Sequence, residues 1–143
     1  VALSPSEAFT LWSSSEGLAR WWLDTATVDL RPGGRYELRF IDDAPVGSQG
    51  SETCRVLSFV PGRMISFTWN APPNLPATRH LHTWVVVDFE AVDAGTRVRA
   101  THLGWPESTW ATPGSQWPET FAYFERAWTM VFGLLGEKFG TPG

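Results

Sequence analysis

The sequence has 143 residues, of which 43% are hydrophobic and 18% charged, and its formal net charge is −4 at pH 7. This length fits a single domain over residues 1–143, and the hydrophobic content argues against wholesale disorder. Because Lys and Arg form no cluster, sequence-independent binding to nucleic acid or to anionic lipid is not expected. No apolar run approaches the roughly 20 residues that a membrane-spanning helix needs.

The cysteine content indicates a reducing compartment. Cys54 is the single cysteine, so no internal disulfide can form and we expect a cytoplasmic protein. Residues 1–5 lack the basic region followed by an apolar stretch that is typical of a secretion signal. Cys54 lies in a predicted strand with no obvious base, and we interpret it as an inert buried thiol.

Two short helices are predicted near the N-terminus. Ser4 and Glu7 form a Ser-x-x-Glu capping box, and Pro5 suits the first helical position. A second short helix is predicted over residues 15–22, where apolar residues recur at helical spacing. The two segments together form a helical hairpin.

The middle of the chain is predicted to form antiparallel strands, because apolar and polar residues alternate there. The strands cover residues 35–40, 53–59, 65–69, 83–91 and 96–103.

The turns between these strands carry proline and glycine. Residues 31–34 and 60–63 each place proline second and glycine third, which suits type II turns. Residues 93–95 predict a three-residue hairpin loop in which Gly95 adopts the left-handed conformation. The proline-rich residues 70–78 are expected to form a loop.

The C-terminal part predicts one long amphipathic helix after a loop over residues 104–116. Its apolar positions, spaced three and four apart, are Trp117, Phe121, Phe124, Trp128, Val131, Leu135 and Phe139. Gly133 and Gly136 weaken the helix by about 1 kcal/mol each relative to alanine. The apolar face must pack on the dry face of the sheet, which indicates an α+β fold.

This order of elements, with several short fragments, resembles the helix-grip fold of the START/SRPBCC (Bet v 1-like) superfamily. The fragments are Arg20-Trp21-Trp22, Pro32-Gly33-Gly34-Arg35-Tyr36, Ile65-Ser66-Phe67-Thr68-Trp69, Gly95-Thr96-Arg97 and Thr101-His102-Leu103-Gly104. Their order and spacing are most similar to the family named after the activator of heat-shock protein 90 ATPase. The resemblance implies a curved antiparallel sheet wrapped around a long C-terminal helix, with two short helices near the N-terminus.

One departure from the family concerns the first strand. Family members usually begin with a complete strand before the first helix, whereas only residues 1–3 can belong to it here. We therefore expect the natural protein to have residues upstream of Val1. The resemblance implies ligand binding, cyclase or hydrolase activity, or a co-chaperone role, and no shared catalytic residue set transfers to this chain.

Common catalytic and nucleotide-binding motifs are absent from the sequence. There is no Gly-x-Gly-x-x-Gly motif and no Gly-x-Ser-x-Gly nucleophile elbow, and the single lysine, Lys138, lies near the end of the last helix. His80, His82 and His102 are candidate zinc ligands, but their spacing is not diagnostic. We predict neither a metal nor a cofactor.

Nine tryptophans and nine phenylalanines either build the core or line a cavity. We expect Trp12, Trp21 and Trp22 to pack the helical hairpin against the sheet as part of the core. We predict that a small hydrophobic or aromatic ligand binds between the sheet and the C-terminal helix. The predicted ligand-binding residues are Tyr36, Phe40, Phe67, Trp69, His102, Trp105, Phe121, Phe124 and Trp128. Trp105 and Trp110 lie in a loop with no periodic reason to be apolar, so they are candidates for the pocket rim.

His102 is the weak candidate for catalysis. It shares a strand face with Val98 and Ala100, so it is either a satisfied core histidine or a group that orients a ligand. A cyclase or hydrolase would need a carboxylate or an arginine within hydrogen-bond reach of His102, and we favour a binding protein over an enzyme. A protein-interaction or co-chaperone module, recognisable by an exposed apolar patch, is the other alternative. The sequence does not decide between a monomer and a homodimer.

Overall fold

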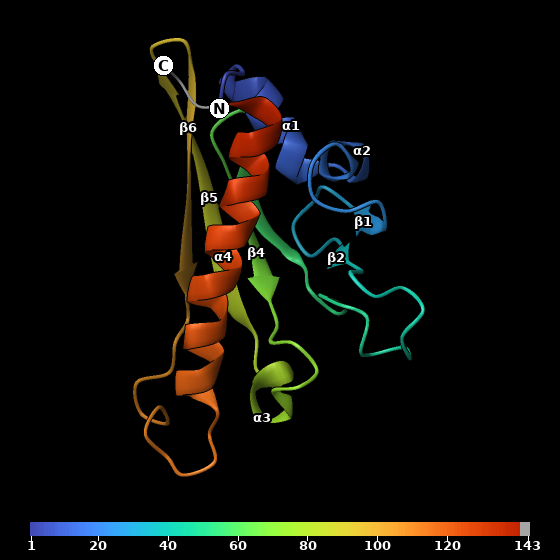
Figure 1. The fold of residues 1–143 in the computed structure, drawn as a ribbon, viewed down its shortest axis with the longest axis vertical. Coiled ribbons are helices and arrows are strands. Elements are labelled where there is room, and N and C mark those ends of the chain that lie inside the picture. Colours follow the sequence, from blue (N-terminus) through green and yellow to red (C-terminus); the bar gives the residue numbers. More distant parts are fainter. Residues whose placement is uncertain (141–143) are drawn as a thin grey trace.

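The chain runs through two short helices, a series of antiparallel strands and one long helix (Figure 1). The computed structural model describes residues 1–140. The elements are α1 (Pro5–Ser13), α2 (Ser15–Ala19), β1 (Ala26–Val28), β2 (Tyr36–Leu38), β3 (Val56–Val60), β4 (Met64–Trp69), α3 (Pro76–Arg79), β5 (Thr83–Val92), β6 (Gly95–Leu103) and α4 (Trp117–Phe139). Among the described residues, no helix combines the length and the apolar character needed to cross a bilayer.

The strands pair only with antiparallel neighbours. The larger sheet has the order β3-β4-β5-β6, while β1 and β2 form a separate two-stranded hairpin. Single bridges from Arg35 to Arg55 and from Arg39 to Gly50 connect β2 with the segment that precedes β3. Figure 1 shows α4 lying lengthwise over the larger sheet, which confirms the predicted helix-grip α+β fold.

The core lies between α4 and the inner face of the sheet. Val85, Val87 and Phe89 of β5 are buried as the alternation predicts, while the residues between them are exposed or half-buried. Phe124 and Val131 of α4 join the same cluster. Burying these side chains removes apolar surface from water, and each Å² buried stabilises the fold by about 25 cal/mol. This layer is therefore the main source of stability.

The N-terminal helices begin as the capping signals predict. The Ser4 hydroxyl accepts a hydrogen bond from the Glu7 N–H, and the Glu7 carboxylate accepts one from the Ser4 N–H. Trp12 and Trp21 are buried in the core, and the Trp21 indole donates to the Leu11 carbonyl at 3.0 Å. The predicted structural role of these tryptophans is therefore confirmed.

Several local predictions differ from the structure. The second helix ends at Ala19 and not at residue 22, and the strand expected over residues 53–59 begins at Val56. Strand β1 and the short helix α3 were not expected, since neither has a clear periodic signal. The predicted left-handed Gly95 is wrong, because Ala94 has the positive φ of 65° and the turn contains two residues. Gly95 begins β6 instead, and a Cβ at this position would collide with the Val1 carbonyl oxygen.

Residues 1–3 run beside the start of β6. The Thr96 N–H donates to the Val1 carbonyl at 2.9 Å, and the Val1 amino group donates to the Thr96 carbonyl at 2.8 Å. The Ala2 N–H donates to the Phe139 carbonyl at 3.0 Å, so this segment also contacts the end of α4.

Candidate functional site

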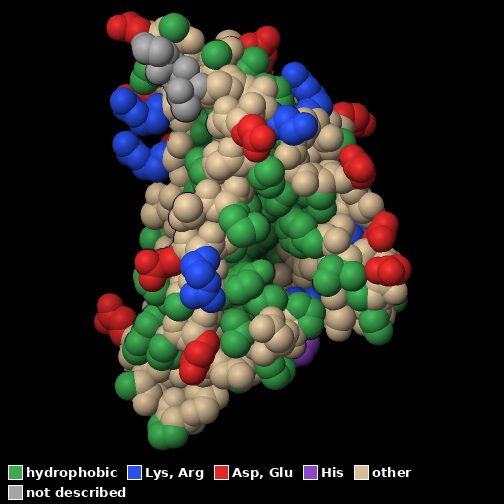
Figure 2. Space-filling model, viewed as in Figure 1, with side chains coloured by type: hydrophobic (Ala, Val, Ile, Leu, Met, Phe, Trp, Pro, Cys, Tyr) green, Lys and Arg blue, Asp and Glu red, His purple; other side chains and the backbone are tan. Residues whose placement is uncertain are grey.

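A cleft of about 340 Å³ opens between α4, residues 40–51 and the segment that follows β4. Figure 2 shows this region as a hollow bordered by hydrophobic side chains. Its volume falls within the range of about 300–1,000 Å³ that is typical of small-molecule sites.

Aromatic side chains from four separate segments form the inner wall of the cleft. Trp22 follows α2 and lies 5.7 Å from Phe40, 6.1 Å from Trp69 and 6.1 Å from Trp128, measured between ring centroids. Trp69 and Trp128 are 5.9 Å apart. Tilted and edge-to-face contacts of this kind fix the rings relative to one another, and they leave aromatic surface directed at the cleft.

Helix α4, which carries Trp128, forms the wall along one whole side of the cleft. Its cleft-lining residues recur three and four positions apart, which places them along one stripe of the helix. They are Tyr123, Phe124, Ala127, Trp128, Met130, Val131 and Leu134. Met130 is 72% exposed, so one side of this wall presents apolar surface to water.

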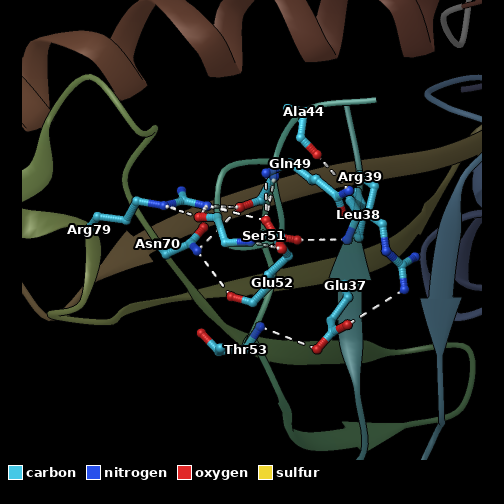
Figure 3. A network of polar contacts seen from close by, with 12 residues as sticks. Glu37, Leu38, Arg39, Ala44, Gln49, Ser51, Glu52, Thr53, Asn70 and Arg79 are labelled. Atoms are coloured by element: carbon cyan, nitrogen blue, oxygen red, sulfur yellow. Dashed lines mark hydrogen bonds and ion pairs between the residues drawn. The ribbon is translucent and has the colours of Figure 1, made fainter. Parts of the chain in front are cut away.

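A buried ion pair holds the remaining wall in place (Figure 3). The Arg79 side chain is 7% exposed, and its Nη2 atom lies 3.5 Å from the Glu52 carboxylate. The guanidinium also donates to the carbonyls of Gly47, Gly50 and Ala71. These bonds connect α3 to the loop before β3, so the cleft wall depends on a contact between distant parts of the chain.

Glu52 is surrounded by hydrogen-bond donors. Burial alone would raise the pKa of this carboxyl group, but the N–H groups of Gly47, Gln49 and Gly50, together with Arg79, outweigh that effect. The pKa of Glu52 is consequently held below its usual value. The loop is thus folded around an ionised carboxylate.

His102 is a satisfied histidine at the edge of the core. Its Nδ1 atom accepts from the Trp128 indole at 3.1 Å, and its Nε2 atom lies 2.6 Å from the Thr83 hydroxyl. Burial lowers the pKa of His102 to about 4, so the imidazole is neutral near neutral pH. Within residues 1–140, the ring forms hydrogen bonds with Thr83 and Trp128, and with neither the carboxylate nor the arginine that acid–base chemistry would require.

The structure divides the nine predicted ligand-binding residues into three groups. Those that line the cleft are Phe40, Trp69, Phe124 and Trp128. Tyr36 and Phe67 are completely buried in the core, where their rings stack at 4.0 Å. The remaining three, His102, Trp105 and Phe121, form an aromatic cluster near the start of α4, outside the cleft lining.

Several lining residues were missed by sequence reasoning. Trp22 was assigned only to the core, and Arg79 was not considered because it lies in a short helix without periodicity. Asn70, at the end of β4, and Gln49, in the preceding polar loop, also line the cleft. The spacing of the α4 residues was the usable signal, since Ala127 lies three residues after Phe124 and Met130 lies three residues after Ala127.

The other predicted reactive groups lie apart from one another. Within the described part of the chain, no three His, Cys, Asp or Glu side chains gather as a metal site would require. His82 contacts the Thr53 hydroxyl at 3.0 Å. Burial raises the pKa of Cys54 to about 12, which keeps this thiol protonated and agrees with the inert role predicted for it.

Comparisons with known proteins address the fold and the family. Protein MLL2253 from Mesorhizobium loti superposes with a TM-score of 0.70 at 18% identity, covering 96% of this chain and 89% of that chain. CalU16 from Micromonospora echinospora gives a TM-score of 0.64 at 19% identity, with 99% of this chain and 72% of that chain covered. Protein SSP2350 from Staphylococcus saprophyticus gives a TM-score of 0.63 at 16% identity, with 100% of this chain and 90% of that chain covered. At these identities the similarity shows the shared fold.

A search of curated proteins gives no match. The model of one protein family, described as Activator of Hsp90 ATPase homolog 1-like protein, matches residues 2–136. This match covers nearly the whole chain and agrees with the fragments that first suggested the family. The chain therefore belongs to the Activator of Hsp90 ATPase homolog 1-like family.

Proposed function

We propose that this protein binds a small hydrophobic or aromatic ligand in the cleft between α4, residues 40–51 and the segment that follows β4. The space between the sheet and α4, where the sequence predicted that the ligand would bind, is occupied by the core. The observation that carries this proposal is the convergence of Trp22, Phe40, Trp69 and Trp128 on one open cleft. A flat apolar ligand would cover aromatic and aliphatic surface that otherwise contacts water, and each Å² buried contributes about 25 cal/mol. The single buried cysteine supports a cytoplasmic location for this activity.

The residues predicted from the sequence have different roles in this proposal. Phe40, Trp69, Phe124 and Trp128 contact the ligand directly. Tyr36, Phe67, Trp105 and Phe121 support these residues from the core or from the adjoining cluster. His102 positions Trp128, because its Nδ1 atom accepts the indole hydrogen bond and thereby orients the ring.

The proposal is tested by titrating ¹⁵N-labelled protein with naphthalene, biphenyl and indole while the tryptophan indole N–H resonances are followed. We expect saturable shifts with at least one compound. Met130→Glu replaces apolar surface at the rim with a hydrated carboxylate and should weaken binding about fivefold, because the ligand loses apolar contact there.

Thr129→Glu is the matched control, because it introduces the same side chain at an exposed neighbouring position outside the cleft lining. Its affinity should stay within about twofold of the wild type. Absence of saturable shifts with all three compounds, or equal weakening by both variants, would contradict binding in this cleft.

A co-chaperone or protein-interaction module is the second candidate. The observation that favours it is an apolar pair on the outer face of the sheet, where Trp84 of β5 lies opposite Leu103 of β6 and both are 40% exposed. Binding to purified Hsp90 that is weakened by Trp84→Ser and unaffected by Met130→Glu would favour this function over ligand binding.

A further inference from the structure

The polar groups of the cleft point to a specific class of ligand. We infer that the cleft takes an uncharged aromatic molecule carrying a hydrogen-bond donor, such as a phenol, and discriminates against the matching carboxylate. This inference rests on the proposed function, because it concerns what the same cleft binds. It follows from three observations on Arg79, Asn70 and Gln49.

The first observation concerns charge. Arg79 is the single charged side chain among the described residues that line the cleft. Its Nε, Nη1 and Nη2 atoms already donate to backbone carbonyls, and the Glu52 carboxylate balances its charge. An anion entering the cleft would lose its hydration without gaining a free cation, which is costly in an apolar site.

The second observation concerns Asn70, which is 8% exposed. Its Nδ2 group donates to the carbonyls of Gly50 at 3.3 Å and Glu52 at 3.1 Å. Both amide hydrogens are therefore used, and the reversed orientation would direct the side-chain oxygen at two carbonyl oxygens.

The Asn70 Oδ1 atom remains available as an acceptor. Within residues 1–140 this oxygen accepts no hydrogen bond, and it remains accessible to solvent. Asn70 is a lining residue of the cleft, and on this inference its Oδ1 atom faces the cleft. A ligand O–H or N–H group can satisfy it.

The third observation is that Gln49 repeats this arrangement on the adjoining wall. Its Nε2 group donates to the carbonyls of Asp42 at 3.1 Å and Ala44 at 3.0 Å, which fixes the orientation of the amide and leaves Oε1 as an acceptor. Ser48 and Tyr123 also line the cleft, and their hydroxyls can rotate to either donate or accept. The two oriented side-chain amides of the cleft thus each offer an acceptor oxygen.

The test compares four probes with one ring system by NMR titration at about pH 7: naphthalene, 2-naphthol, 2-methoxynaphthalene and 2-naphthoate. We expect 2-naphthol to bind about three- to tenfold more tightly than 2-methoxynaphthalene, the range of one net hydrogen bond. The 2-naphthoate anion should bind at least tenfold more weakly than 2-naphthol.

Each other result has a distinct meaning. Equal affinity for 2-naphthol and 2-methoxynaphthalene, or 2-naphthoate binding as tightly as 2-naphthol, would overturn the inference while the proposed function stands. Binding of naphthalene with no detectable binding of 2-naphthol would do the same. If no probe binds, naphthalene included, the proposed function fails and the inference fails with it.

Variants assign the preference to the two amides. Asn70→Ala and Gln49→Ala should each reduce the ratio of the 2-naphthol and 2-methoxynaphthalene affinities toward one. Asn74→Ala is the matched control, since Asn74 is exposed and lies outside the cleft lining, and it should keep the wild-type ratio. If a cleft variant does not fold, the affinities of the wild type for the four probes test the inference by themselves. If both variants fold and neither changes the ratio of the 2-naphthol and 2-methoxynaphthalene affinities, the assignment to Asn70 and Gln49 is wrong.

Discussion

At the scale of single residues, His102 shows how burial determines what a reactive group can do. A proton on Nδ1 would face the indole N–H of Trp128, which now donates to that nitrogen. Protonation therefore breaks this hydrogen bond and also places a charge beside apolar side chains. The sequence placed His102 on the inner strand face, and the structure gives it the role of a neutral acceptor that orients Trp128.

The first prediction concerns the pH dependence of stability. The pKa of His102 is about 4 in the folded protein, against an ordinary value of 6.5. Between these two pH values the unfolded chain binds a proton at His102 that the native state does not. The contribution of His102 to the free energy of unfolding is therefore complete above about pH 6.5 and is lost as the pH falls to about 4. We expect His102 to contribute about 1–3 kcal/mol to the decrease in unfolding free energy over this range.

Urea unfolding of the wild type and of His102→Gln at several pH values measures this contribution. The variant should show a smaller loss of stability on acidification, whereas His80→Gln, which removes an exposed imidazole, serves as the control. Parallel pH profiles for the wild type and His102→Gln would refute the assignment.

At the scale of elements, two helical glycines differ in whether the surrounding packing leaves room for a side chain. Gly133 lies in α4, and a Cβ at this position would meet no atom within 4 Å. No neighbouring atom therefore requires a glycine at this position. Gly17 in α2 is the opposite case, because an added Cβ would collide with the Thr10 carbonyl oxygen and lie 2.8 Å from the Leu11 Cα atom.

The second prediction follows from this contrast. Gly133→Ala should raise the free energy of unfolding by about 0.5–1 kcal/mol, since alanine is the better helix former and nothing must move. Gly17→Ala should lower it by about 1–3 kcal/mol, because the α1–α2 corner must shift. Thermal unfolding of both variants distinguishes the two cases, and a change of the same sign in both would be inconsistent with the packing described.

At the scale of the whole molecule, the Arg79–Glu52 pair connects α3, the loop before β3 and the cleft. Arg79 is buried and donates to the carbonyls of Gly47, Gly50 and Ala71, which would otherwise lose a partner. The exposed pair between Arg97 and Glu90 on β6 and β5 has no such role.

The third prediction compares these two pairs. Arg79→Met should destabilise the protein by about 3–5 kcal/mol, because it leaves a buried carboxylate and several carbonyls without their partner. Arg97→Met should change the stability by less than about 1 kcal/mol, as is usual for surface ion pairs. Chemical denaturation measures both, and similar losses in the two variants would show that the buried pair does not hold the cleft wall.

The family resemblance and much of the fold were predictable because their signals are local. Ser4 and Glu7 are close enough in sequence to form the capping box whatever the rest of the chain does. Gly33 and Gly62 adopt the positive φ that their turns require. Periods of two and of three to four identified the inner faces of β5 and α4 before any packing was known.

The depth of a residue on an inner face was determined only by tertiary structure. Tyr36 and Phe40 alternate identically, yet Tyr36 stacks on Phe67 in the closed core whereas Phe40 lies beside Trp22 in the open cleft. Periodicity states which way a side chain points and carries no information on which distant segment covers it. The cleft, and the use of Arg79 within it, arise from contacts between segments far apart in the chain.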